Sequence, residues 1–137
     1  DGGQAAVYVK QKKLEPQVLK FLQEQSPGKF QILIRKEIQR YKAYPHASFA
    51  LVAEDGYAFG KNLKGEWVIK TPSTKGHHGQ LPSHPQMKTG FIASGPGVKA
   101  GLILEKVRLL DIAPTVAKLL GLRMTGVEGR PINLNPN

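Results

Sequence analysis

The first part of the chain switches between a strand-like and a helix-like pattern of apolar positions. Residues 5–10 are rich in β-branched and aromatic side chains and predict a strand. Residues 14–25 carry apolar side chains at positions i, i+4, i+7 and i+8, which is the stripe of an amphipathic helix. Pro16 suits the first turn of this helix, and Ser26-Pro27-Gly28 ends it.

Two further apolar runs follow this helix. Residues 30–35 predict a second strand, and residues 48–53 predict a buried strand that ends at the turn Glu54-Asp55-Gly56. Between them, the pattern of residues 37–44 fits either a continuation of the second strand or a short helical turn. The sequence leaves that choice open.

The middle of the chain is less regular. Residues 57–59 and 66–70 predict a hairpin, because a polar segment separates two short apolar runs. Residues 71–85 are rich in Pro, Gly and His and predict an irregular loop. Residues 89–93 return to an apolar pattern and predict one more strand.

A second amphipathic helix is predicted over residues 111–120. Asp111 is placed at its N-cap, Pro114 falls in its first turn, and Gly121 lies just past its end. We expect its apolar stripe to pack on the sheet. Strands and helices that alternate in this way predict an α/β or α+β fold with a mixed sheet and flanking helices. We expect residues 1–137 to form a single domain.

Composition narrows the functional classes. The chain has 40% hydrophobic residues and no run of apolar residues long enough for a membrane span. The net charge is +10, but Lys and Arg are scattered along the chain, so we expect no dedicated nucleic-acid binding. The absence of Cys excludes disulfides and thiolate ligands and leaves the compartment open.

The residues with the most informative chemistry are concentrated between residues 76 and 101. Gly76-His77-His78-Gly79 places two imidazoles between glycines, which allow backbone and metal to approach closely. A Pro-containing loop then leads to residues 90–94 and the turn Gly95-Pro96-Gly97. No nucleophile elbow, P-loop or dinucleotide-binding loop is present. From the residues alone, part of a metal site and an exposed pair of loop histidines both stay open.

The other candidate side chains have simpler interpretations. His46 and His84 lie beside prolines, where we expect exposed loop histidines. Asp55 is expected to bond its own backbone in a turn. Asp111 is expected to cap its helix and not to bind a metal.

Taken in order, several of these motifs resemble the C-terminal part of the type I phosphodiesterase/nucleotide pyrophosphatase family, within the alkaline phosphatase superfamily. The matching motifs are Gly76-His77-His78-Gly79, Met87, Phe91–Gly97, Lys99-Ala100-Gly101, Asp111-Ile112-Ala113-Pro114-Thr115, Leu119-Leu120-Gly121 and Glu128-Gly129-Arg130-Pro131-Ile132. Residues 51–57 are similar to the strand and turn that precede the loop in that family. Residues 1–47 match it only in general character.

The resemblance implies a C-terminal segment of an alkaline phosphatase-like fold and a metal-dependent hydrolase of phosphodiesters or nucleotides. Such enzymes usually hold two zinc ions about 4 Å apart, which activate the nucleophile and neutralise phosphoryl charge. The family's metal ligand is the His directly before the second Gly of the loop, which is His78 here. His77 falls on the variable position. The implied partners are a phosphodiester or nucleotide substrate and the rest of the parent catalytic domain.

The chain also departs from that family. It has no segment that matches the nucleophile region, the early Asp ligand or an Asp-His-Gly motif. A two-metal site needs about six protein ligands, so His78 cannot hold the pair alone. We therefore expect these residues to be the C-terminal portion of a longer enzyme and to be inactive in isolation. The resemblance implies a secreted or periplasmic parent.

Two alternatives remain open at this stage. One is a non-catalytic α/β module that binds a partner or polyanion through its basic surface. The other is a different reaction of the same superfamily, namely hydrolysis of phosphomonoesters, phosphonates or sulfate esters.

Overall fold

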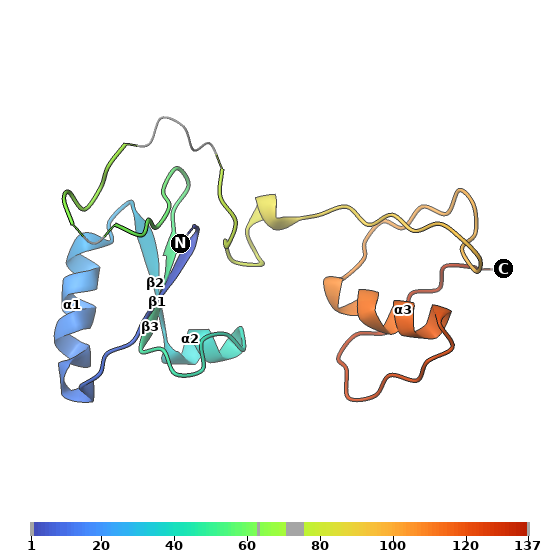
Figure 1. The fold of residues 1–137 in the computed structure, drawn as a ribbon, viewed down its shortest axis with the longest axis horizontal. Helices are drawn as coiled ribbons and strands as arrows, with labels where there is room; N and C mark the ends of the chain where they lie inside the picture. Colours follow the sequence, from blue (N-terminus) through green and yellow to red (C-terminus); the bar gives the residue numbers. More distant parts are fainter. Residues whose placement is uncertain (1, 63, 71–75, 137) are drawn as a thin grey trace. The chain divides into compact units, whose positions relative to one another are not determined.

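The computed structural model describes residues 2–62, 64–70 and 76–136, and Figure 1 traces their path. The chain divides into two compact units, residues 1–88 and 89–137. The expectation of a single domain stays a prediction. In the described part of the chain, every helix is too short or too polar to cross a membrane.

A three-stranded antiparallel sheet forms the centre of the first unit (Figure 1). Its strands are β1 (Gln4–Val7), β2 (Phe30–Ile34) and β3 (Phe49–Ala53), in the order β1-β3-β2. Because β3 pairs antiparallel with both neighbours, β1 and β2 run parallel to each other on either side of it. Helix α1 (Glu15–Gln25) connects them, which makes a split βαβ arrangement. The chain therefore mixes helices and strands as expected, but the expected mixed sheet is wrong for the described residues.

Strand β3 is buried along its whole length and carries a hydrophobic cluster on each face. On one face, Leu51 packs with Leu22 of α1. On the other face, Ala50 packs with Ile38 of α2 (Arg35–Arg40). Because β3 is covered on both faces, residues 48–53 form a continuous apolar run and not an alternating one.

The helices of the first unit follow their local signals. Pro16 lies in the first turn of α1, and Gly28 adopts a φ of 68° just beyond its end. Residues 37–44 fitted either a strand or a short helical turn, and helix α2 shows that the helical interpretation is correct. The Glu37 carboxylate accepts the backbone N–H of Ile34 at 2.9 Å, which caps the first turn.

The predicted hairpin of residues 57–59 and 66–70 does not form in the described residues. Phe59 instead bridges Gly2, with backbone N–H···O distances of 2.7 and 3.0 Å. Trp67 places its ring 5.4 Å from that of Phe21, measured between centroids, and stays 81% exposed. The intervening segment is longer than the loops that favour hairpins, so Phe59 pairs with the chain start instead.

The second unit is built around helix α3 (Ile112–Leu119), preceded by a 3₁₀ turn (Leu109–Asp111). Gly121 adopts a φ of 67° just after this helix, as its C-terminal position predicts. The apolar stripe that we expected to pack on a sheet is exposed at Val116, Leu119 and Leu120.

The strand predicted over residues 89–93 is absent from the described part of the second unit. These residues belong to no strand of the described structure, and Ile92 is 95% exposed. A strand pattern marks residues that suit a sheet, but hydrogen bonding to a neighbour is still required to form one. The turn after this segment is present, because Val98 N–H donates to the Gly95 carbonyl at 3.1 Å.

Candidate functional site

The histidine loop, residues 76–79, lies against the start of the chain. The backbone N–H of Gly3 donates to the carbonyl oxygen of His78 at 2.7 Å. A Cβ atom at Gly3 would come within 2.9 Å of that oxygen, and one at Gly2 would come within 3.4 Å of His78 Cε1. The two glycines therefore allow a close approach that larger residues would prevent. No motif of the sequence assigns a role to Gly2 or Gly3.

Both histidines of this loop are exposed. Their ring centroids lie 6.4 Å apart, and the ring planes are inclined by 69°. Among the described residues, no hydrogen bond engages the ring of His78, although its backbone is held by Gly3. This combination gives His78 a fixed backbone and an accessible ring.

A complete metal site is not present in the described residues. No group of three or more His, Cys, Asp or Glu side chains lies close enough together there to hold a metal ion. The donor set of this part of the chain therefore does not fit a two-zinc centre by itself. His46, the remaining histidine outside this loop region, is exposed as expected.

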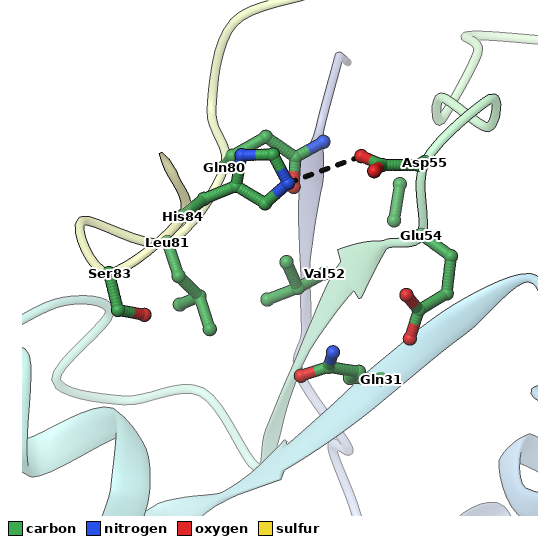
Figure 2. Close-up of a pocket in the computed structure, with 9 residues that line it drawn as sticks. Gln31, Val52, Glu54, Asp55, Gln80, Leu81, Ser83 and His84 are labelled. Carbon is green, nitrogen blue, oxygen red and sulfur yellow. Dashed lines mark hydrogen bonds and ion pairs between the residues drawn. The ribbon is translucent and has the colours of Figure 1, made fainter. Parts of the chain in front are cut away.

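A second polar contact joins the same loop region to the end of β3. His84 Nε2 lies 3.2 Å from Asp55 Oδ1 (Figure 2). His84 Nδ1 accepts the backbone N–H of Gln86 at 3.3 Å. Since Nδ1 is an acceptor, the neutral ring carries its proton on Nε2 and donates it to Asp55. The structure thus corrects two expectations, because His84 is only partly exposed and Asp55 pairs with a side chain 29 residues away.

Loop and sheet together surround a hollow of about 200 Å³ beside this pair (Figure 2). Val52 and Gln31 are cross-strand partners on one sheet face, and Leu81, which follows the histidine loop, lies opposite them. The residues that line the hollow are Gln31, Val52, Ala53, Glu54, Asp55, Gln80, Leu81, Ser83 and His84. No sequence signal pointed to this hollow, because it depends on strand register and loop placement.

In the second unit, Asp111 uses its carboxylate differently from the helix cap that we expected. Arg108 binds both oxygens, with Nη2–Oδ1 at 2.7 Å and Nε–Oδ2 at 3.1 Å. The backbone N–H of Arg130 also donates to Oδ1, at 2.9 Å. Hydrogen bonds from Arg108 first, and from Arg130 second, lower the pKa of Asp111 to about 2.

These contacts join two motifs of the sequence, residues 111–115 and residues 128–132. Thr115 Oγ1 donates to the carbonyl of Asp111 and accepts the backbone N–H of Ile132 at 2.9 Å. Gly129 lies so close to Leu110 that a Cβ atom would overlap its carbonyl. Asp111 and Thr115 therefore join the start of α3 to the C-terminal segment of the second unit.

The fold and the loop define a small mixed α/β chain that presents one backbone-anchored, exposed histidine. No family model matches the chain, and no solved structure matches it. The mouse (Mus musculus) protein bis(5'-adenosyl)-triphosphatase enpp4 is 29% identical to it over 117 residues, which is 85% of this chain and 22% of the mouse protein. The chain thus spans about a fifth of the length of this relative. The match gives loose support to the family resemblance found in the sequence.

Proposed function

We propose that this chain is a C-terminal segment of a metal-dependent hydrolase of the phosphodiesterase/nucleotide pyrophosphatase kind. In this proposal the parent has an alkaline phosphatase-like fold and acts on a phosphodiester or nucleotide. The observation that carries it is the match to a mouse bis(5'-adenosyl)-triphosphatase over 85% of the chain. The ordered motifs between Gly76 and Ile132 support the same assignment.

We assign to His78 the role of one metal ligand. A neutral imidazole offers a ring nitrogen to zinc without the loss of a proton, and His78 is exposed. Its backbone is held by Gly3, so little conformational freedom is lost when a metal binds. His77 lies on the same loop without a Gly3 hydrogen bond to its carbonyl and serves as the matched comparison.

The remaining ligands and the nucleophile are proposed to come from other parts of the parent. The described residues offer no three-ligand cluster, so no catalytic step is assigned to them. Zinc, when bound by the complete set, supplies Lewis-acid stabilisation of phosphoryl oxygens. The isolated 137-residue chain is therefore expected to show no metal-dependent turnover.

The test is hydrolysis of bis(4-nitrophenyl) phosphate with added zinc by the parent protein that contains this segment. We expect His78→Ala to lower turnover by more than about a hundredfold and to lower bound zinc. His77→Ala on the same loop should stay within a few-fold of the wild type. Equal activity of the His78 variant and the wild type, at equal zinc content, would remove His78 from the metal site.

One alternative has its own supporting observation. The net charge of +10 and the lack of a ligand cluster in the described residues also fit a non-catalytic module that binds a polyanion. Salt-sensitive binding of polyphosphate by the isolated chain, unchanged by His78→Ala, together with an inactive parent, would favour this alternative.

A further inference from the structure

The segment from His78 to His84 makes two contacts beside the sheet, one with Gly3 just before β1 and one with Asp55 just after β3. The first contact is backbone to backbone, from Gly3 N–H to the His78 carbonyl at 2.7 Å. The second contact, six residues later, is side chain to side chain, between His84 and Asp55 (Figure 2). Between them, the loop residue Leu81 lines the hollow over the sheet face.

The side-chain contact is directional. His84 is held on both ring nitrogens, since Nδ1 accepts from Gln86 N–H at 3.3 Å while Nε2 faces Asp55 at 3.2 Å. The His84 backbone is also fixed, because its N–H donates to Leu81 and its carbonyl accepts from Met87, both at 2.9 Å. A ring held at both nitrogens cannot rotate without losing a hydrogen bond, so it defines the position of the loop relative to Asp55.

The pair is too exposed to contribute much to global stability. The side chain of Asp55 is 79% exposed and that of His84 is 25% exposed. Contacts of this kind have small effects on global folding, so their loss shifts a local equilibrium and leaves the core of β3 intact.

We propose that Asp55 and His84 form a positioning pair for the loop that presents His78. The pair holds the loop on the sheet so that the His78 ring keeps its place beside Gly2. The functional meaning of that position rests on the proposed role of His78 as a metal ligand, whereas the positioning itself does not require metal.

The experiment is NMR spectroscopy of the metal-free 137-residue chain. In the wild type, long-range ¹H–¹⁵N spectra should show His84 protonated on Nε2, and a nuclear Overhauser effect should connect His78 Hε1 with a Gly2 Hα. In Asp55→Ala, both signatures should weaken, and the Gly3 amide should exchange with solvent roughly two- to fivefold faster. Exchange of amides within β3 should not change.

Three further variants make the result specific. Asp55→Asn keeps an oxygen that can accept from Nε2, so it should retain the His78–Gly2 signal. Glu54→Gln removes the neighbouring carboxylate of the same hollow and should have no effect. His84→Ala should reproduce the effect of Asp55→Ala, and the double variant should add nothing more.

Two outcomes would overturn the proposal. One is an unchanged His78–Gly2 signal in Asp55→Ala although the His84 signature is lost. The other is an equal effect of Glu54→Gln, which would indicate a general charge effect. Because no zinc is present, either failure can be distinguished from failure of the proposed function, which is judged by zinc content and hydrolysis.

Discussion

The carboxylate of Asp111 accepts the backbone N–H of Arg130 at 2.9 Å, across 19 residues of sequence. It also binds the guanidinium of Arg108 through both oxygens. One side chain thus ties the start of α3 to the C-terminal segment. We expect the stability of the second unit to depend on this charge, because an ionised carboxylate is a stronger acceptor than a neutral group.

This contact predicts acid sensitivity of the second unit. The pKa of Asp111 is lowered from 3.8 to about 2, so the folded state favours the ionised form. The stabilisation by Asp111 is therefore fully present above pH 3.8 and is lost as the pH falls to about 2. In urea unfolding from pH 6 to pH 2, the free energy of unfolding of the wild type should exceed that of Asp111→Asn at pH 6. This difference should shrink as the pH falls from 3.8 to about 2.

Glu105→Gln is the control for the same experiment, since it removes an exposed carboxylate of the second unit. Its unfolding midpoint should follow that of the wild type at every pH. A constant difference between wild type and Asp111→Asn from pH 6 to pH 2 would contradict the role given to the Asp111 charge.

Gly129 should be the least replaceable glycine of the second unit. A Cβ atom there would overlap the carbonyl of Leu110, a backbone group that cannot rotate away. We expect Gly129→Ala to lower the free energy of unfolding by about 1–3 kcal/mol or more, measured by urea titration. Gly90→Ala, where a Cβ meets nothing within 4 Å, should leave it nearly unchanged. An unchanged free energy of unfolding in Gly129→Ala would mean that residues 128–132 do not pack against residues 110 and 111 as described.

Gly3 should contribute to stability through its contact with the histidine loop. Its Cβ would come within 2.9 Å of the His78 carbonyl oxygen, so Gly3→Ala should break the hydrogen bond between them. The expected cost is about 0.5–1.5 kcal/mol in unfolding free energy, together with changed shifts of the His78 ring. Gly60→Ala, which has open space around it, is the matched variant in the same unit. Identical His78 spectra in both variants would exclude this dependence.

Much of the secondary structure was predictable because its causes are local. Helix α1 follows from its apolar stripe with Pro16 at the start, and helix α3 from a similar stripe with Gly121 after its end. The predicted strands at β1, β2 and β3 also form. The predicted strand at residues 89–93 does not, because strand formation depends on a partner that the local pattern cannot supply.

In the candidate site, too, local features could be predicted from the sequence and contacts between distant residues could not. The glycine-bounded pair His77-His78 could be recognised from the sequence, because the residue types and their order carry the resemblance. The partners of that loop could not be recognised. Gly3 and Asp55 lie far from the loop in sequence, and neither belongs to a spacing pattern that predicts contact with it.

The order of the amino acids alone predicted helices α1 and α3 and the buried strand β3, whereas the choice of His78 as candidate ligand rests on the family resemblance. These elements depend on side-chain period, caps and turns within a few residues. Tertiary structure decided that β3 lies between β1 and β2, that Asp55 holds His84, and that Asp111 holds Arg130. Such contacts join distant residues, and they exist only once the burial of apolar surface has brought those segments together.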